Sequence, residues 1–564
     1  MKLNSLGYYV QEDGRLFFPV GANYWPSSCG VEMWIAWPEV EIAADLDLVV
    51  ALGLNSIRFF TRWQDFEPVA GDYSETAFAR LDRFLELCAA RGLRAQPSFF
   101  VGWMSGGLFW PDWKGGRNLF ADDEIVERSV AYARTLARRL RAHTTTLLGI
   151  DLGNELDALA ESRSAAPASV RRWCERVTSV IREELTGVLI HSGCDKGQVT
   201  ADAGWRLGAG AQPGIDVITM HGYPVPGWHP VPSGGLRDPL MQSLLPYYVA
   251  CARAFGPVLL QEFGTIVPGE SPHCDAYLRA VLPACLRAGA NGFLWWCLRD
   301  IRADETHPYA KNDFESLLGL VDSNGEVKPG LRYYVEFARE LCALTEPPAA
   351  HHPEIALYWP SHYYERDVPE NPGNVARESA ARMSLANHLL GHAAGVAIVR
   401  GGNAVPEGVT TLVIAGSCLT PNETNALRLW VERGGRLLWH GPNAYNWGAA
   451  MSALAGADVV DYHAPSTITV DFAGRAHRLE ATMRGVRLEV APRGACVIAR
   501  DEDGRPAILR HVLGRGVMVA VLADIEGGLL KRWGGTGGGL AVQAEGREWF
   551  SRMLALLRSE PGTA

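Results

Sequence analysis

Residues 147–155 read Leu147-Leu148-Gly149-Ile150-Asp151-Leu152-Gly153-Asn154-Glu155, an apolar run that ends in a glutamate. A second run of the same character is Gly256-Pro257-Val258-Leu259-Leu260-Gln261-Glu262-Phe263-Gly264. Buried parallel strands are nearly continuous apolar runs, and barrel enzymes carry functional side chains at the carboxyl ends of such strands. The two runs therefore predict two strands of an α/β barrel, each of which delivers a carboxylate to the same end.

The same alternation of a short apolar strand and an amphipathic helix runs through residues 1–347. Eight such units in about 330 residues favour a (β/α)8 TIM barrel over an open, doubly wound sheet, which is the alternative for this pattern. The predicted strands are Leu16–Gly21, Ser56–Phe60, Arg94–Phe99, Leu147–Leu152, Val188–His191, Val217–His221, Val258–Gln261 and Gly292–Trp296.

A second pattern begins after the Pro-rich segment Thr345–Pro353, which reads as a linker. Residues 350–564 predict a smaller α/β domain, with strands such as Thr411–Ala415 and Arg436–His440 and a β-rich insertion at about residues 457–512. The Gly-rich stretch Gly534–Gly539 predicts a loop.

The composition is that of an ordinary globular protein, with 48% apolar residues, 21% charged residues and a net charge of −10. This charge gives no support to binding of nucleic acid or of an anionic membrane, and no apolar stretch is long enough to predict a membrane span. The start of the chain, Met1–Tyr8, lacks the apolar segment of a secretory signal. Eleven scattered cysteines without a Cys-x-x-Cys pair indicate reduced thiols rather than disulfides or a zinc site. We therefore expect a cytoplasmic protein.

The paired glutamates predict cleavage of a glycosidic bond. This reaction needs an acid that protonates the departing oxygen and, where configuration is retained, a carboxylate that attacks the anomeric carbon. Asn154 beside Glu155 can bind a sugar 2-hydroxyl, and Arg58 can keep Glu262 ionised. Each signal is weak alone, because Asn-Glu recurs at residues 422–423, where the pattern predicts a helix start, and strand-end charges often form structural ion pairs.

Further polar and aromatic residues lie where a sugar would bind. His221 and Tyr223 follow at the end of the sixth predicted strand and can hydrogen-bond a sugar hydroxyl or the nucleophile. The alternative is that His221 is a core residue whose hydrogen bonds are all made within the protein, which is the commoner case for a lone histidine. Two tryptophans end the eighth predicted strand, and strand alternation lets one of them, for which Trp296 is preferred, face the interior. Tryptophans in Gly- and Pro-rich loops suit the apolar faces of sugars, with structural packing as the alternative. The candidate substrate-binding residues of these groups are His221, Tyr223, Trp295, Trp296, Trp103 and Trp25.

In their order along the strands, these residues resemble the clan A glycoside hydrolases, and glycoside hydrolase family 5 in particular. The motif Trp63-Gln64-Asp65-Phe66-Glu67-Pro68 looks like the second βα loop of such enzymes, and Gly319-Leu320-Val321-Asp322 is similar to the stretch that ends their barrels. The resemblance covers residues 15–345.

This resemblance implies roles for the individual residues. Glu155 would be the acid/base and Glu262 the nucleophile of a retaining enzyme that needs neither a metal nor an organic cofactor. Around the sugar it implies Arg58, Asn154, His221, Tyr223 and a tryptophan at 295 or 296.

The loops Gly102–Trp113 and Asn23–Pro26 look like those of bacterial family 5 β-mannosidases. Bulky loops that close one end of a groove favour exo action on short oligosaccharides, so the leading expectation is an exo-acting β-mannosidase. The alternatives are a β-glucosidase, a β-galactosidase, an endo-β-glucanase or mannanase, and a non-catalytic carbohydrate-binding protein.

Residues 350–564 resemble in architecture the flavodoxin-like or amidotransferase-like domain that follows the barrel in family 42 β-galactosidases. There the domain supports trimers, so the resemblance implies a homo-oligomer formed through this domain. Cys418 could be an amidotransferase nucleophile, but the sequence around it shows no glycine elbow and no evident partner His–Glu pair, which favours a structural cysteine.

Overall fold

The computed structural model describes residues 1–207, 212–303, 305–349, 353–361, 373–391, 396–416, 418–442, 447–464, 467–472, 474–480, 486–533 and 539–559. The chain forms two compact units, one of Met1–Val225 with Gly234–Ala350 and one of Pro226–Ser233 with His351–Ala564. Within the described residues, none of the helices combines the length and the apolar character that a membrane crossing requires.

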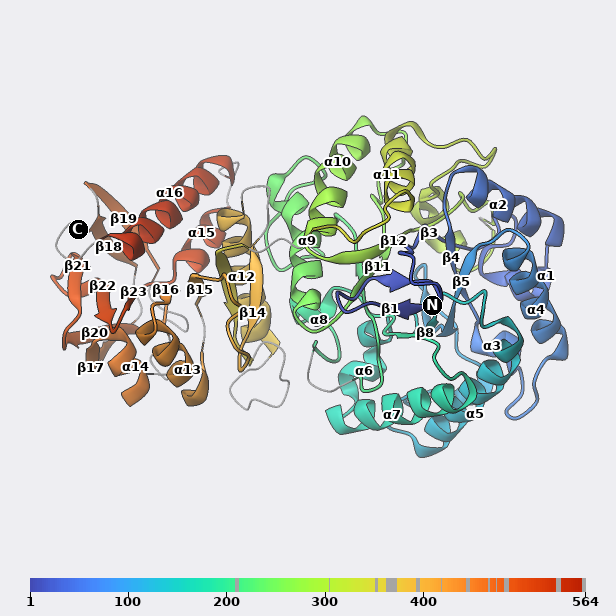
Figure 1. The fold of residues 1–564 in the computed structure, drawn as a ribbon, viewed down its shortest axis with the longest axis horizontal. Helices are drawn as coiled ribbons and strands as arrows, with labels where there is room; N and C mark the ends of the chain where they lie inside the picture. Colours follow the sequence, from blue (N-terminus) through green and yellow to red (C-terminus); the bar gives the residue numbers. More distant parts are fainter. Residues whose placement is uncertain are drawn as a thin grey trace. The chain divides into compact units, whose positions relative to one another are not determined.

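The first unit is a barrel of eight parallel strands in the order β10-β11-β12-β3-β4-β5-β8-β9, and a bridge between His191 and Val217 joins its two ends. This confirms the predicted (β/α)8 barrel and excludes the open sheet. Figure 1 shows the helices around these strands. The strands are β3 (Val20–Asn23), β4 (Ser56–Phe60), β5 (Arg94–Phe100), β8 (Ile150–Gly153), β9 (Ile190–His191), β10 (Ile218–Gly222), β11 (Val258–Phe263) and β12 (Ala290–Trp295). The longer helices are α2 (Glu39–Ala51), α4 (Glu75–Ala89), α5 (Asp123–Leu140), α7 (Pro167–Glu184), α9 (Pro239–Arg253), α10 (Pro272–Arg287) and α11 (Arg332–Cys342).

Side-chain caps fix where several barrel helices begin. Ser74 accepts a hydrogen bond from the backbone of Ala77 at the start of α4, and Asp122 accepts one from Ile125 at the start of α5. Ser271 caps α10 in the same way and is followed by a proline at the first helical position. Each such cap is worth about 1 kcal/mol and sets the length of the preceding βα loop.

The predicted first strand, Leu16–Gly21, is wrong at its start. Residues 15–17 pair instead with the N-terminal hairpin β1 (Lys2–Leu3) and β2 (Tyr9–Val10): Phe17 donates its backbone N–H to Tyr9, and Leu16 bridges Val10. The barrel strand begins only at Val20, after Pro19, which has no N–H to donate to a neighbouring strand.

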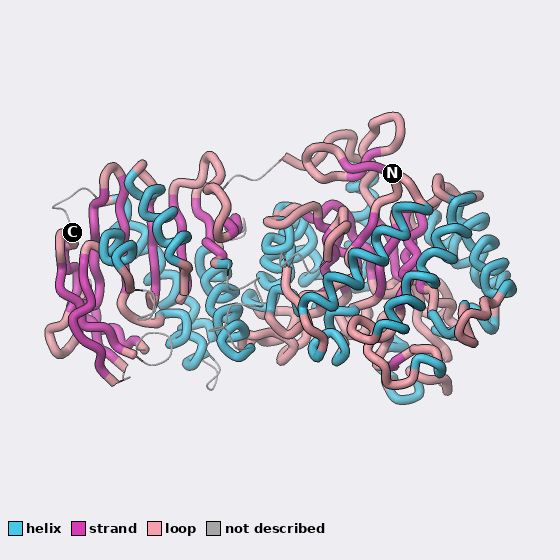
Figure 2. Tube along the Cα trace, turned by 90° about the horizontal axis from the view of Figure 1, so that it is seen from below, coloured by secondary structure: helices cyan, strands magenta, loops and turns pink. Residues whose placement is uncertain are grey.

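This hairpin covers the amino end of the barrel, as Figure 2 shows beside the N label. Tyr9 packs with Leu148, Val217, Leu259 and Leu294 in one buried cluster, and its hydroxyl lies 2.7 Å from Nε2 of His191. The opposite, carboxyl end of the strands is therefore left for the functional site, as expected for this fold.

The βα loops at the carboxyl end carry short elements of their own. A small hairpin of β6 (Trp103–Met104) and β7 (Gly107–Leu108) follows β5. After β12 come the 3-10 turns η5 (Tyr309–Lys311) and η6 (Asp313–Leu317). The remaining short helices are α1 (Met33–Ala36), α3 (Trp63–Phe66), α6 (Ala160–Ser164) and α8 (Gly197–Thr200).

The second unit is built on a seven-stranded sheet in the order β14-β13-β15-β16-β23-β22-β21 (Figure 2). The first five strands are parallel and the last two antiparallel. Helices α13 and α14 pack on one apolar face of the sheet. The strands are β13 (Ile355–Trp359), β14 (Ala397–Arg400), β15 (Thr411–Ala415), β16 (Arg436–His440), β21 (Cys496–Arg500), β22 (Pro506–Leu513) and β23 (Gly516–Val521), and the helices are α12 (Gly373–Leu390), α13 (Pro421–Glu432), α14 (Ala449–Ala455), α15 (Ile525–Trp533) and α16 (Gly539–Arg558).

Residues 457–512 are rich in strands, but they do not form one separate sheet. Two antiparallel ribbons, β17 (Ala457–His463) with β20 (Arg487–Pro492) and β18 (Ile468–Phe472) with β19 (Arg475–Leu479), precede β21 and β22, which extend the main sheet. Of the predicted loop Gly534–Gly539, residues 534–538 lie outside the described part of the chain and Gly539 begins α16. The Asn-Glu at residues 422–423 belongs to α13, where Thr420 and Glu423 form a capping box, so this dipeptide is a helix start as predicted.

Candidate active site

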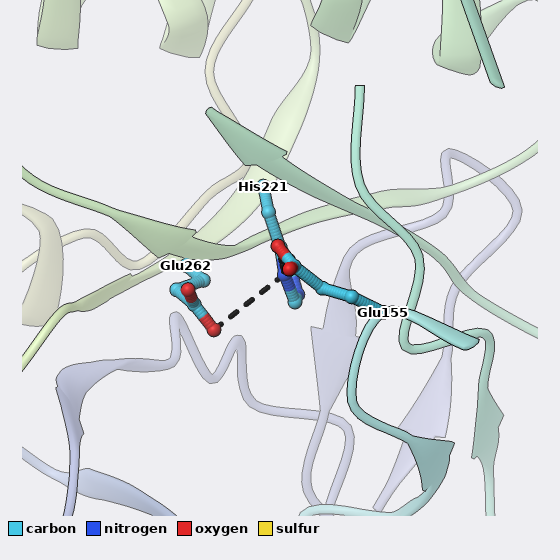
Figure 3. Close-up of side chains that lie close together, drawn as sticks. All are labelled: Glu155, His221 and Glu262. Atoms are coloured by element: carbon cyan, nitrogen blue, oxygen red, sulfur yellow. Dashed lines mark hydrogen bonds and ion pairs between the residues drawn. The ribbon is translucent and has the colours of Figure 1, made fainter. Parts of the chain in front are cut away.

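Glu155, His221 and Glu262 meet at the carboxyl end of the barrel. They come from the end of β8, from β10 and from β11, and Figure 3 shows the three side chains converging. One oxygen of each carboxylate and one imidazole nitrogen all lie within 4.8 Å of one another. Nδ1 of His221 is 3.0 Å from Oε1 of Glu155 and 3.5 Å from Oε2 of Glu262. A carboxylate pair this close is typical of retaining glycosidases, since inverting enzymes leave room for a water between carboxyl groups about 6.5–9.5 Å apart.

Arg58 organises the base of the site from full burial. Its guanidinium donates to Oε2 of Glu262 at 3.1 Å and to Oδ1 of Asn154 at 2.9 Å. It also donates twice to Oδ2 of Asp151, at 3.1 and 2.8 Å, and once to Asn23 at 2.9 Å. Because the buried cation is shared between two carboxylates, its desolvation is compensated, and one rigid group positions both Glu262 and Asn154.

Tyr223 completes the surroundings of Glu262. Its hydroxyl donates to Oε1 of Glu262 at 2.7 Å, opposite the oxygen that Arg58 binds. Burial, and then the negative charge of Glu262, raise the pKa of Tyr223 well above its usual range, so the phenol keeps the proton it donates. Both carboxylate oxygens of Glu262 therefore accept hydrogen bonds, which fixes its orientation.

A chain of amides holds His221. Its Nε2 lies 2.9 Å from Oε1 of Gln261, whose amide nitrogen donates to Gln96 at 2.9 Å. An amide oxygen only accepts, so Nε2 carries a proton, and Nδ1 is the atom that shares a hydrogen bond with Glu155. Burial lowers the pKa of His221, but the charges of Glu262 and Glu155 together outweigh this effect and the pKa is raised.

Glu155 has the properties of an acid. Burial raises the pKa of its carboxyl and the charge of Glu262 adds to the rise, against the opposing hydrogen bond from His221. Its backbone has φ 49° and ψ 41°, a left-handed conformation that costs a residue with a Cβ roughly 1–2 kcal/mol. Its N–H donates to the carbonyl of Gly193 at 2.8 Å. Strain of this kind is commonly held at functional sites, where the surrounding structure over-determines it.

The four candidate tryptophans divide into two pairs. Trp296 and Trp103 lie at the site: Nε1 of Trp296 donates to Glu315 at 3.2 Å, and the carbonyl of half-exposed Trp103 accepts from Asn154 at 2.8 Å. Trp295 and Trp25 are buried to 1% exposure. Trp295 packs on Phe263 and Tyr334, with ring centroids 5.3 and 5.6 Å away, and Trp25 stacks on Phe60 at 5.2 Å. The structure thus assigns Trp25 and Trp295 to the core, where neither offers a ring face to a sugar.

Sequence reasoning missed several residues that shape the site. Asp151 and Gln261 each carry a detectable signal, because they are polar residues within otherwise apolar strands. Gln96 carries the same signal in β5. No sequence signal marks Glu315 as a site residue, because Glu315 lies in an irregular loop after β12.

The cluster of Glu155, His221 and Glu262 is also the kind of group that could hold a metal ion. Both oxygens of Glu262 already accept hydrogen bonds, and the buried Arg58 guanidinium beside it disfavours a second cation. The donors and acceptors fit the hydroxyl groups of a neutral sugar better.

In the second unit, an amidotransferase nucleophile at Cys418 would need a histidine that can act as a base. The structure contains a buried His–Glu pair that the sequence did not reveal, with Nδ1 of His440 2.7 Å from Glu526. Both residues are fully buried, and Nε2 of His440 accepts from the indole of Trp549 at 3.4 Å. With both ring nitrogens engaged, His440 is not available as a base.

The whole chain is similar to a solved structure, the exo-β-1,4-mannosidase from the Opitutaceae bacterium strain TAV5. The two are 52% identical, the match covers 98% of this chain and 99% of that one, and the TM-score is 0.94. The chain belongs to glycoside hydrolase family 5 of clan A. The family 5 resemblance seen in the sequence is thereby confirmed.

Three more distant structures share the fold. A GH5_18 enzyme from Streptomyces cattleya, in complex with Manβ1-4GlcNAc, is 24% identical over 71% of this chain and 99% of its own, with a TM-score of 0.59. The β-galactosidase from Rahnella sp. R3 is 15% identical over 98% of this chain and 90% of its own, with a TM-score of 0.69. A GH42 β-galactosidase from G. stearothermophilus, 14% identical over 97% of this chain and 89% of its own with a TM-score of 0.66, likewise extends beyond the barrel, in agreement with the architecture expected from family 42 enzymes. No family model and no curated protein matches the sequence.

Proposed function

We propose that this family 5 hydrolase is a retaining exo-β-mannosidase that releases mannose from the ends of short β-mannosides. The observation that carries the chemistry is the approach of Glu155 and Glu262 to within 4.8 Å between carboxylate oxygens. The sugar is inferred from the 52% identical neighbour, which is named as an exo-β-1,4-mannosidase.

In the proposed reaction, Glu262 attacks the anomeric carbon while Glu155 protonates the departing oxygen. The bond to the leaving group breaks as an ester bond to Glu262 forms. Glu155, now ionised, then takes a proton from the water that displaces the sugar from Glu262. Arg58 and Tyr223 hold Glu262 in position during the first step by donating to its two oxygens, and His221 stabilises the charge that Glu155 acquires.

Asn154 is set to bind the sugar 2-hydroxyl. Its Oδ1 accepts from Arg58 and one of its amide hydrogens is donated to the carbonyl of Trp103. The second amide hydrogen remains for the sugar, in an orientation fixed from both sides. Hydrogen bonds to this hydroxyl strengthen at the transition state of glycosidases.

The β6–β7 hairpin supports exo action. It is fastened to the loop after β12, where Asn312 donates to the carbonyl of Ser105 at 3.0 Å and His307 packs on Phe109 with ring centroids 5.4 Å apart. In this proposal, the hairpin and the loop joined to it close one end of the site. A sugar chain would then enter with its terminal residue only.

Substitution of the two glutamates tests the catalytic roles. We expect Glu262→Gln and Glu155→Ala to lower kcat/KM for an aryl β-mannoside by at least about 10²-fold, since acid–base groups alone contribute about 10²–10⁴-fold. Glu270→Gln, an exposed carboxylate in the loop after β11, is the matched control and should retain activity. A loss below about tenfold in both site variants would show that these residues do not carry the reaction.

Product analysis separates the competing specificities. Nitrophenyl β-mannoside, β-glucoside and β-galactoside distinguish the sugar, and defined manno-oligosaccharides distinguish release of mannose from release of larger products. NMR of the first-formed sugar should show the β-anomer, which follows from two successive inversions. An α-anomer as first product would exclude the double displacement.

A further inference from the structure

A third carboxylate, Glu315, lies close enough to Glu262 and Glu155 for their charges to act on it. It belongs to η6, where Phe314 and Leu317 are 45% and 47% exposed while Glu315 is partly buried. Oε2 of Glu315 accepts from the indole nitrogen of Trp296 at 3.2 Å. The reaction proposed above requires only Glu155 and Glu262, so Glu315 has no part in the chemical steps.

The surroundings of Glu315 are those of a binding group. Burial raises the pKa of Glu315 to about 7; Trp296 and Ser105 oppose this rise, and the charges of Glu262 and Glu155 add to it. A carboxylate can accept about four hydrogen bonds. The indole of Trp296 takes up one of these positions and Ser105 lies beside another, which leaves acceptor capacity for the hydroxyl donors of a sugar.

The position of Glu315 also defines which part of a sugar it would meet. It shares its loop with Asn312, the residue that joins this loop to the β6–β7 hairpin. Glu315 is therefore tied, through its own loop, to the β6–β7 hairpin that is proposed above to close one end of the site. In the binding mode that we infer, the sugar lies against Trp296 with its anomeric carbon between Glu155 and Glu262 and its far ring edge toward Glu315.

We propose that Glu315 accepts hydrogen bonds from the hydroxyl groups of the terminal sugar on the ring edge opposite the cleaved bond, and thereby selects for an unextended chain end. This inference rests on the proposed exo-glycosidase function and assigns to Glu315 the binding of the terminal sugar of the substrate.

The test combines a substitution with substrates that lack single hydroxyl groups. Glu315→Gln replaces a charged acceptor by a neutral one of the same shape, and Asp313→Asn, an exposed carboxylate on the same turn, is the matched control. With the nitrophenyl β-mannoside, Glu315→Gln should lower kcat/KM by about 10- to 100-fold, as expected for a hydrogen bond to a charged group. Asp313→Asn should change it less than about twofold.

The deoxy substrates distinguish binding from a structural effect. One of the 3-, 4- and 6-deoxy mannosides lacks the hydroxyl that Glu315 binds, and wild type should cleave it with a kcat/KM that is lower by a comparable factor. In Glu315→Gln this difference in kcat/KM should shrink, because the partner of that hydroxyl has already been removed. If every deoxy penalty is the same in the variant as in wild type, or if Glu315→Gln keeps wild-type kcat/KM, the inference is overturned. If wild type cleaves none of the β-mannosides, it is the proposed function that fails.

Discussion

In the proposed reaction Glu155 must hold a proton in order to donate it, and the site raises the pKa of Glu155 by burial and by the nearby charge of Glu262. A raised pKa extends the protonated form to higher pH, so kcat/KM should fall on the alkaline side as Glu155 ionises. We expect this alkaline limb for phenyl β-mannoside, whose leaving group needs protonation. For dinitrophenyl β-mannoside, whose leaving group departs unprotonated, the limb should flatten.

The contribution of Glu155 to the alkaline limb is measured by the pH profiles of wild type with the two substrates. Glu155→Ala, which lacks the acid, is the reference. The variant should show a flat alkaline side with both substrates. Identical alkaline limbs for the two leaving groups in wild type would mean that another group, such as His221, sets the limb.

At the scale of elements, the β6–β7 hairpin and its attachment to the loop after β12 decide the shape of the site. Gly106 has φ 87°, and a Cβ built on it would lie 1.7 Å from Nδ2 of Asn312, the atom that bonds Ser105. Gly106→Ala should therefore detach the hairpin from its support as well as strain its backbone. We expect kcat/KM for the aryl mannoside to fall about tenfold or more, since small displacements at a positioned site cost rates of this order.

Gly115→Ala is the matched control for this substitution. Gly115 also has a positive φ, 57°, but nothing lies within 4 Å of a Cβ there. Both variants should lose about 1 kcal/mol of stability in urea unfolding from backbone strain, and only Gly106→Ala should lose activity. Equal activities in the two variants would show that the hairpin does not depend on this contact.

At the scale of the whole molecule, no disulfide joins the cysteines, all of which lie within the described residues. All eleven cysteines are free thiols, and most are buried in the two units. A reducing agent should therefore change neither the Tm nor the activity, whereas loss of a native disulfide typically costs about 2–5 kcal/mol and several degrees of Tm. Scanning calorimetry with and without the reducing agent measures this Tm. A fall of several degrees on reduction would reveal a cross-link between chains or units.

The oligomeric state also belongs to this scale. The likeness of the chain to a family 42 fold is one of architecture, and the formation of a homo-oligomer through the second unit stays a prediction. Sedimentation of the intact protein measures it.

The sequence by itself determined the barrel and predicted the residues that we propose to react, because apolar runs of strand length specify buried parallel strands and a parallel barrel gathers their carboxyl ends in one place. Glu155, Glu262, Arg58, His221 and Tyr223 could be predicted for this reason. The first strand was misplaced because the N-terminal hairpin, a long-range pairing, took residues 15–17.

Only the tertiary structure decided what lies between the strands and around the site. It assigned Trp295 and Trp25 to the core, it connected His221 to Gln96 through Gln261, and it brought Glu315 from an irregular loop to Trp296. Loop conformation depends on contacts between segments far apart in the chain, for which local periodicity contains no signal. The proposed reaction therefore follows from strand patterns, whereas the proposed recognition of the end of the sugar depends on loop packing.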